Sequence, residues 1–285
     1  MNVENQKSKI KNQKSSPIGI FDSGYGGLTV LKEIVRKLPD YDYLYLGDNA
    51  RTPYGTRSYE TVYQYTLECV KKLFSMNCNL VIVACNTASA KALRNIQQID
   101  LPKIAPTKRV LGVIRPTTEI VGKYSKTKHI GIFGTTGTVL SNSYPTEIKK
   151  FFPELKVVQE PCPMWVPLVE ANEFENDGAD FFIEKNLKNL FTKDNKIDTI
   201  ILGCTHYPLL LKKIKKYIPK NVTVLSQGAI VADGLANYLE RHPEMEKRCS
   251  KNGMLEFYTT DSTENFDKSG SLFFAKKIKS MRLDL

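Results

Sequence analysis

The amino-acid sequence predicts an α/β fold of two pseudo-symmetric domains, each a mostly parallel sheet flanked by helices, with the active site in the cleft between them. Short apolar runs alternate with helical patterns along the chain, which is typical of parallel sheets covered on both faces. The order of motifs also repeats. The run IGIF occurs at 18–21 and again at 130–133, and a later apolar run ending at a cysteine follows each copy, at Cys85 and Cys204. Two matched pairs in the same order indicate a duplicated unit.

The chain divides into three predicted segments. Residues 1–16 carry lysines but lack the apolar core of a signal peptide, so we expect a disordered basic leader. The first α/β unit is expected to begin at residue 17, and the second at residue 109. The proline-containing stretch at 101–106 marks the crossing into the second unit.

The first unit contains two loops that we expect to carry function. A buried strand at 17–21 ends in Asp22-Ser23-Gly24-Tyr25-Gly26-Gly27, and the helix after it stops at Pro39. A strand at 41–46 leads into the nine-residue loop 47–55, and Ser58 is placed to cap the next helix, which runs to about residue 76. The run VIVACNTASAKAL at 81–93 then predicts a strand, the residues Cys85, Asn86 and Thr87, and an alanine-rich helix.

The second unit repeats this organisation. Its first strands are expected at 110–114 and 128–133, followed by a helix at 141–152 and a strand at 155–159. The segment 162–170 is proline-rich, and Glu170 follows an apolar run there, which is an unusual place for a carboxylate without a partner. The stretch DTIILGCTHYPLLL at 198–211 predicts a buried strand, then Cys204, Thr205 and His206, then a helix with Pro208 in its first turn. The remaining predicted elements are a strand at 222–225, a helix at 229–241 and a strand at 254–260.

The composition is that of an ordinary soluble globular protein. The chain has 285 residues, of which 41% are hydrophobic and 25% charged, and no apolar run approaches the length of a membrane span. The net charge of +11 comes without any nucleic-acid-binding signature, so we interpret it as a solvated basic surface and expect no nucleic-acid partner. The six cysteines form no CxxC pair, which predicts reduced thiols, no metal site and a cytoplasmic location.

The two cysteines at strand ends suggest acid–base chemistry. A thiol at a strand-to-helix junction meets free backbone N–H groups and the helix dipole, so it tends to ionise. If the two units face each other, Cys85 and Cys204 lie on opposite walls of one cleft. A thiolate on one wall can remove a proton from a carbon acid while a thiol on the other supplies one to the opposite face, which inverts the carbon. Asp22 and His206 are placed to assist, and an amino acid could be oriented by Ser23, Asn86, Thr87 and Thr205.

Five motifs occur in a characteristic order: FDSGYGGLTVL at 21–31, GDNARTPYG at 47–55, ACNTASA at 84–90, PLVE at 167–170 and LGCTHYPLL at 202–210. Together they resemble the glutamate racemases, cofactor-independent enzymes that make D-glutamate for bacterial peptidoglycan. The resemblance covers essentially everything after residue 16. It implies a homodimer and two α/β domains. The first domain is formed by residues 17–108 and completed by the C-terminal residues 226–285, and the second is formed by residues 109–225.

The resemblance also implies roles for individual residues. Cys85 is expected to deprotonate D-glutamate and Cys204 to deprotonate L-glutamate, with Asp22, Glu170 and His206 assisting these thiols. The expected substrate contacts are Asp22, Ser23, Pro53, Tyr54, Gly55, Asn86, Thr87, Thr135, Thr138, Thr205 and His206. Three segments depart from the family's usual residues: Asp48-Asn49, Arg115-Pro116-Thr117 and Ser226-Gln227-Gly228. None is expected to touch a catalytic position, so we expect them to leave the activity alone.

Other interpretations stay open at this stage. Asp22 could cap the following helix, and Glu170 could be a structural ion-pair partner. A racemase of aspartate or of another acidic amino acid is the nearest enzymatic alternative, since a pair of cysteines does not select the length of the side chain. A non-catalytic amino-acid-binding regulatory protein is the alternative from another class. A pyridoxal-dependent enzyme is rejected because no lysine sits in a suitable phosphate-binding setting.

Overall fold

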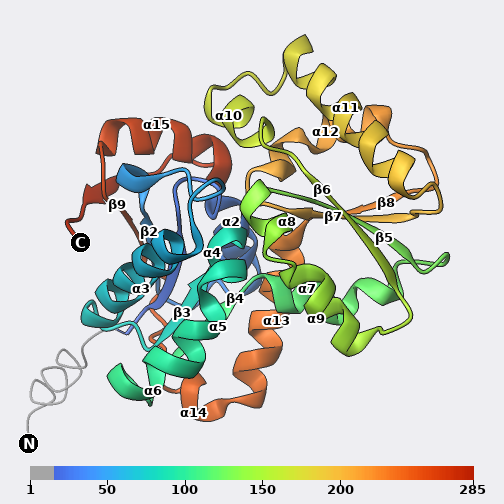
Figure 1. Ribbon diagram of the computed structural model, residues 1–285. Coiled ribbons are helices and arrows are strands. Elements are labelled where there is room, and N and C mark those ends of the chain that lie inside the picture. The colour runs from blue at the N-terminus through green and yellow to red at the C-terminus, as the bar shows by residue number, and fades with distance from the viewer. Residues whose placement is uncertain (1–15) are drawn as a thin grey trace, which may run out of the picture.

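The computed structural model describes residues 16–285, and it contains two parallel sheets (Figure 1). The six-stranded sheet has the order β10-β9-β2-β1-β3-β4, and the four-stranded sheet has the order β6-β5-β7-β8. The strands of the first sheet are β1 (Ile18–Asp22), β2 (Tyr43–Gly47), β3 (Leu80–Val83), β4 (Arg109–Gly112), β9 (Leu255–Thr259) and β10 (Ser280–Arg282). Those of the second are β5 (His129–Gly134), β6 (Lys156–Pro161), β7 (Thr199–Gly203) and β8 (Thr223–Leu225).

The two sheets repeat one arrangement, as the duplicated motifs predict. The order β2-β1-β3-β4 in the first sheet corresponds to β6-β5-β7-β8 in the second, and every pair is parallel. The two IGIF runs form the central strands β1 and β5. The strands that end at Cys85 and Cys204, β3 and β7, are their direct neighbours. Because the strands are parallel, both cysteines lie at the carboxyl edges of their sheets, where ligands of such folds collect.

The strand expected at 110–114 belongs to the other sheet. Instead of opening the second unit, β4 pairs with β3, with Leu80 opposite Arg109 and Val83 opposite Gly112. The segment after β3 is a helical crossover, and such a crossover returns the chain to lay a parallel strand beside the one it left. Ile114 already begins a helix. The division of the chain into domains at residue 109 stays a prediction, but the strand itself completes the first sheet.

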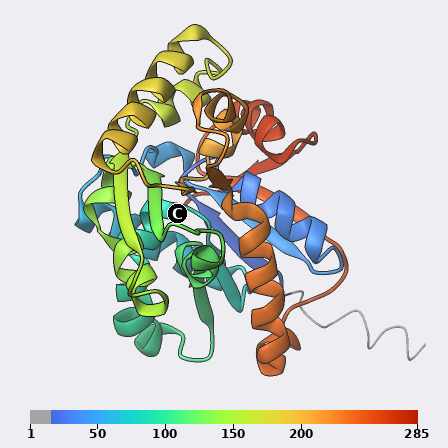
Figure 2. The same ribbon diagram turned by 90° about the vertical axis from the view of Figure 1, so that its right-hand side faces the viewer.

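The C-terminal segment completes the first sheet, as expected. Strand β9 pairs with β2 and β10 pairs with β9. The helix that precedes them, α13 (Gln227–Arg241), packs against α2 (Leu28–Lys37), and Figure 2 shows these two helices side by side. The last helix, α15 (Thr263–Phe274), places Phe273 against the ring of His206, with 5.2 Å between ring centroids. The chain after residue 226 therefore supports residues of both units.

Helices of varied length connect the strands, and some differ from expectation. Ser58 caps α3 by accepting a hydrogen bond from the N–H of Thr61, as predicted. The helix expected at 141–152 is interrupted at Asn142, whose φ of 55° lies in the left-handed region. The proline-rich segment 162–170 contains a short helix, and a 3-10 turn follows Cys204 before α12 begins.

The remaining helical elements have these bounds: η1 (Asn49–Arg51), α3 (Tyr59–Ser75), α4 (Asn86–Lys91), α5 (Leu93–Asn95), η2 (Ile96–Asp100), α6 (Leu101–Ile104), α7 (Ile114–Ile120), η3 (Val121–Lys123), α8 (Thr136–Leu140), α9 (Ser143–Phe151), α10 (Trp165–Glu170), α11 (Asp177–Lys193), η4 (Tyr207–Leu210), α12 (Leu211–Tyr217) and α14 (Pro243–Glu246). None of the helices in the described part of the chain combines the length and apolar character that a bilayer crossing requires. Ser16 is the one residue of the predicted leader that the structure describes; residues 1–15 lie outside it.

Candidate active site

A cavity of about 220 Å³ lies at the carboxyl edges of both sheets, and it contains both predicted thiols. Cys85 follows β3 of the first sheet, and Cys204 follows β7 of the second. Each is 6% exposed. Of the residues predicted to form the site, those that line this cavity are Ser23, Pro53, Tyr54, Gly55, Cys85, Asn86, Thr87, Thr135, Glu170, Cys204, Thr205 and His206.

Cys85 lies in a neutral hydrogen-bonding environment at the start of α4. Its sulfur accepts a hydrogen bond from the N–H of Ala88 at 3.5 Å, and the hydroxyl of Ser23 lies 3.5 Å from it. Burial nevertheless raises the pKa of Cys85 to about 12, and the nearby charge of Asp22 acts in the same direction, against the two hydrogen bonds. The expectation that the strand-end position would favour ionisation is therefore wrong for Cys85, because desolvation outweighs the backbone donor.

Asp22 lies behind Ser23 and is fully buried, so it does not line the cavity. Its carboxylate accepts hydrogen bonds from the N–H of Gly24 at 3.0 Å and from the hydroxyl of Thr205 at 3.4 Å. Burial raises the pKa of Asp22, although the charge of His206 and these hydrogen bonds oppose the shift. Asp22 thus joins the loop of one sheet to the loop of the other, and it acts on the cavity through its neighbours.

Cys204 has a charged partner, unlike Cys85. The Nδ1 atom of His206 lies 3.9 Å from the sulfur of Cys204, and its Nε2 atom lies 3.0 Å from a carboxylate oxygen of Glu170. Burial by itself lowers the pKa of His206, but the hydrogen bonds and charges of Cys204 and Glu170 outweigh it and raise the pKa to about 10. The three side chains form a carboxylate–imidazole–thiol chain.

Three threonine hydroxyls meet where the loops of the two sheets come together. The hydroxyl oxygens of Thr87 and Thr135 are 2.9 Å apart, and that of Thr138 lies 3.4 Å from Thr87. Thr138 is fully buried and holds Thr135 from behind, at 3.1 Å, without lining the cavity. The carbonyl of Gly55 also accepts a hydrogen bond from the N–H of Gly137 at 2.8 Å, which ties the loop after β2 to the second sheet.

The loop after β2 is fixed by a buried carboxylate. Asp48 is fully buried, and one of its oxygens accepts hydrogen bonds from the Nε of Arg51 at 2.7 Å and from the hydroxyl of Tyr54. The other oxygen accepts from the hydroxyl of Thr260 at 3.0 Å. These contacts hold the backbone from Pro53 onward against the cavity.

Sequence reasoning missed several lining residues, among them a group after β6. Thr52, Thr56 and Thr136 flank residues that were predicted, whereas Cys162, Pro163, Val166 and Pro167 form a wall to which only Glu170 had been assigned. The duplication contains the signal that could have identified this wall. Strand β6 occupies the place of β2 in the repeated order, and the loop after β2 was already predicted to line the site.

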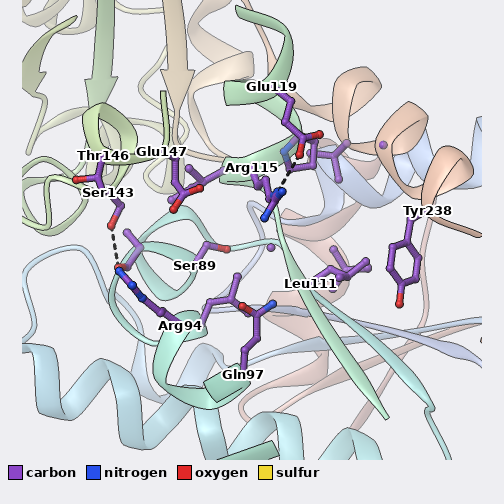
Figure 3. A pocket seen from close by; sticks show the side chains of 18 of the residues that line it. Ser89, Arg94, Gln97, Leu111, Arg115, Glu119, Ser143, Thr146, Glu147 and Tyr238 are labelled. Carbon is purple, nitrogen blue, oxygen red and sulfur yellow. Dashed lines mark hydrogen bonds and ion pairs between the residues drawn. The ribbon is translucent and has the colours of Figure 1, made fainter. Parts of the chain in front are cut away.

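A second, larger cavity of about 710 Å³ lies elsewhere, between α4, α7, α9 and α13. Figure 3 shows Arg94, Arg115, Glu119 and Glu147 around it, with Arg115 paired to Glu119. Neither Cys85 nor Cys204 lines this cavity, so it is not the site of the predicted chemistry. Within residues 16–285 no group of three His, Cys, Asp or Glu side chains is arranged to hold a metal ion.

Comparisons with known proteins agree with this geometry. The family model described as Asp/Glu/hydantoin racemase matches residues 18–234. A glutamate racemase of Persephonella marina is 41% identical over 271 residues, which is 94% of this chain and 97% of that protein. A crystal structure of a glutamate racemase isoform from Bacillus anthracis superposes with a TM-score of 0.86 at 36% identity, covering 96% of this chain and 99% of the other. The glutamate racemase of Francisella tularensis in complex with D-glutamate superposes with a TM-score of 0.84 at 30% identity, covering 95% and 98%.

Proposed function

The chain belongs to the Asp/Glu/hydantoin racemase family, and from that premise we propose that it interconverts L- and D-glutamate, with Cys85 and Cys204 as the two acid–base groups and without a cofactor. The observation that carries the proposal is that the two thiols, contributed by matching positions of two sheets, line one small cavity. A binding protein would need neither thiol. An isomerase that inverts a carbon by the two-base route needs a proton-transferring group on each face, and a thiol can serve as either group.

In this mechanism the proton changes face at the α-carbon. The thiolate of Cys204 removes the α-proton of L-glutamate, so the C–H bond breaks on one face and its electron pair stays on the substrate. The thiol of Cys85 then donates its proton to the opposite face, which gives D-glutamate, a Cys204 thiol and a Cys85 thiolate. In the reverse direction Cys85 is the base. Because a proton is moved and no electron is transferred to the protein, no redox group is involved.

The two walls of the cavity suit the two protonation states of this cycle. His206, with its pKa raised to about 10, carries a proton at neutral pH beside the sulfur of Cys204. Burial keeps Cys85 protonated, since its pKa is raised to about 12. A positive charge beside Cys204 and a protonated Cys85 suit a reaction in which Cys204 removes the proton and Cys85 supplies one. Before the next turnover in this direction, Cys204 must lose the proton that it has gained and Cys85 must regain one.

The cavity also offers neutral groups for the substrate. Ser23, Asn86, Thr87 and Thr205 line it, and they can hold the carboxylate and ammonium groups of an amino acid. The loop at Pro53, Tyr54 and Gly55 and the hydroxyl of Thr135 complete the substrate contacts that we propose. Asp22 and Thr138 position these groups from behind the wall.

Proton NMR in deuterated water tests the function directly. Purified protein with L-glutamate should produce D-glutamate that carries deuterium at the α-carbon, while the remaining L-glutamate keeps its proton during early turnover, because two different groups remove and supply the proton. Deuterium entering both enantiomers equally from the start would contradict the two-thiol mechanism. Faster turnover of aspartate would favour a racemase of the shorter amino acid, and inertness towards both would favour a binding role.

Substitution of either thiol tests the assignment of the bases. Cys85→Ala and Cys204→Ala should each lower kcat by about 10³-fold or more, since acid–base groups contribute about 10²- to 10⁴-fold. Cys249→Ala is a matched control, because Cys249 is also buried but does not line the cavity. Its activity should equal that of the unmodified protein. Near-normal activity of either cavity variant removes that residue from the mechanism.

We further propose that the D-glutamate supplies peptidoglycan synthesis, that the protein is a homodimer and that it works in the cytoplasm. All six cysteines are free and buried, which suits a reducing compartment. Restored growth of a bacterium that requires D-glutamate tests the metabolic role, and fractionation of the source cells tests the location. Light scattering coupled to size-exclusion chromatography should give about twice the chain mass of 32.3 kDa, and a single-chain mass would rule out the dimer.

A further inference from the structure

A closed ring of buried hydrogen bonds lies behind Asn86, the residue that follows Cys85 and lines the cavity. The hydroxyl of Tyr144 donates to Oδ1 of Asn86 at 2.6 Å, and Nδ2 of Asn86 donates to Oε1 of Gln227 at 2.8 Å. Nε2 of Gln227 donates to the hydroxyl of Tyr144 at 2.8 Å and closes the ring. All three side chains are at most 4% exposed.

The ring has one direction, and a backbone carbonyl sets it. Nε2 of Gln227 lies 3.1 Å from the carbonyl oxygen of Val113, which can only accept a hydrogen bond. The nitrogen of the Gln227 amide must therefore be on that side, and its oxygen must face Asn86. Burial raises the pKa of Tyr144, so its hydroxyl keeps the proton that it donates. An isolated asparagine could turn its amide over. If Asn86 did so, its oxygen would face Oε1 of Gln227, and two acceptors would be opposed.

The ring draws its members from separate parts of the chain. Asn86 opens α4 of the first unit, Tyr144 lies on α9 of the second, and Gln227 opens α13. Helices α4, α7 and α13 meet between the two sheets (Figure 1). The hydroxyl oxygen of Thr117 on α7 also lies 3.1 Å from Nε2 of Gln227, so the two N–H groups of this amide are shared among three acceptors. Helices α7 and α13 are thus linked to each other and to the neighbour of Cys85.

We propose that Gln227 and Tyr144 are positioning residues that hold the amide of Asn86 in one orientation at the wall of the cavity. The amide of Asn86 has one N–H and one lone pair of its oxygen left over from the ring, and these are the groups that remain for a substrate. Gln227 and Tyr144 do not line the cavity and touch no reacting atom. The proposal rests on the proposed function.

A double-mutant cycle tests this role. Gln227→Met keeps the length of the side chain and removes its hydrogen bonds, so it should lower kcat/KM for glutamate at least tenfold. In a protein that already carries Asn86→Ala, the same substitution should change kcat/KM less than twofold, because Gln227 then has no amide to position. A merely structural role would lower the activity by similar factors in both backgrounds, and that result would overturn the proposal.

Tyr144→Phe opens the ring by removing a single oxygen atom and provides a second variant. It should lower kcat/KM by a factor similar to that of Gln227→Met. In a protein that already carries Asn86→Ala, it should change kcat/KM less than twofold. Tyr43→Phe is the matched control, because Tyr43 is also buried and donates to a carbonyl, that of Leu38, at 2.7 Å, but belongs to the opposite end of its sheet. Its kcat/KM should be unchanged.

The outcomes separate this inference from the proposed function. If the unmodified protein does not racemise glutamate, the proposed function fails first. If the unmodified protein is active and both Gln227→Met and Tyr144→Phe retain full activity, the orientation of the Asn86 amide by the ring is not needed for the reaction. If neither variant folds, as judged by circular dichroism and thermal unfolding, the ring is structural and the proposal is wrong.

Discussion

At the scale of single residues, Cys85 and Cys204 differ in the groups that surround them. Cys204 faces an imidazole that is itself held by Glu170, whereas Cys85 meets a hydroxyl and a backbone N–H. The equilibrium between two enantiomers has a constant of one, so kcat/KM must stay equal in the two directions whatever a substitution does. Asymmetry between the walls therefore shows in kcat and KM taken separately, and in the pH dependence of the reaction.

Glu170→Gln should lower kcat/KM by about 10- to 100-fold in both directions. The substitution keeps a hydrogen-bond acceptor near His206 but removes the negative charge that helps to raise the pKa of His206. A fall of one to two pKa units in His206 corresponds to about 1.4 to 2.7 kcal/mol, or about tenfold to 100-fold. Steady-state rates with each enantiomer measure the loss. The matched control is Glu173→Gln, a carboxylate on the same segment that does not line the cavity, which should leave the rates unchanged.

His206 also predicts a pH dependence of stability. The folded protein holds the proton of His206 up to about pH 10, whereas an unfolded chain releases it near pH 6.5. The stabilisation is complete below about pH 6.5 and is lost as the pH rises towards 10, at a rate of at most about 1.4 kcal/mol per pH unit. Urea unfolding at pH 6, 8 and 10 should show this decline.

Comparison with a His206→Gln variant isolates the contribution of this residue from that of other titrating groups. The stability difference between the two proteins should be largest near pH 6 and shrink towards pH 10. A difference that stays constant across this range would mean that His206 is not the group that holds the proton.

At the scale of elements, the loop from β2 to α3 owes its shape to one side chain. Asp48→Asn keeps one oxygen but turns an NH₂ group towards Arg51 and Tyr54, which are themselves donors. Because this loop supplies Pro53, Tyr54 and Gly55 but neither thiol, we expect KM to rise about tenfold while kcat changes much less. Initial rates over a range of glutamate concentrations separate the two constants.

Asp198→Asn is the control for the Asp48 variant. Asp198 is also a largely buried carboxylate, and it accepts hydrogen bonds from Ser125, Lys126 and Thr127. It precedes β7, however, and so lies at the end of the second sheet that is away from the cavity. Its loss should lower stability without changing KM. An unchanged KM in Asp48→Asn would show that the loop keeps its shape without that carboxylate.

The limits of sequence reasoning are visible in particular elements. The apolar run at 110–112 looks the same whichever sheet it joins, because register and partner are decided by the crossover that precedes it and not by the run itself. The wall at 162–167 was overlooked because its prolines suggested irregular backbone, although the repeated order of strands placed it next to the cavity. The strands that end at Cys85 and Cys204 were predictable, since buried β-branched runs and duplicated motifs agree there.

The sequence does not indicate which polar side chains form hydrogen bonds with residues far away in the chain. Nothing in the residues around Gln227 indicates that its amide meets Asn86, 141 positions away in the chain. The same holds for Asp48 and Thr260, which come from distant strands of one sheet. The charge balance at Cys85 was misjudged for a related reason, because burial depends on the packing of both units and cannot be estimated from a strand end alone.

At the scale of the whole molecule, the catalytic cavity depends on how closely the two units approach, and Gly26 lies at their contact. A Cβ atom built on Gly26 would overlap the hydroxyl of Thr205 and the ring of His206. Nearby, the hydroxyl of Thr29 donates to the carbonyl of Thr205 at 2.9 Å, which holds the same two loops together. A side chain at position 26 must therefore push the loop after β7 away from the loop after β1, and with it the wall that carries Cys204.

Gly26→Ala should accordingly lower kcat/KM by about 100-fold or more, since a displacement of about 1 Å in a catalytic group costs roughly that much. Each sheet should keep its own hydrogen bonds, so the far-ultraviolet circular dichroism spectrum should be unchanged. Gly24→Ala is the control within the same loop, because a Cβ there meets its nearest atoms at 3.5 Å or more. It should retain most of the activity. If Gly26→Ala proves as active as Gly24→Ala, the two units are free to separate without loss of function, and the close contact between them is not what aligns the thiols.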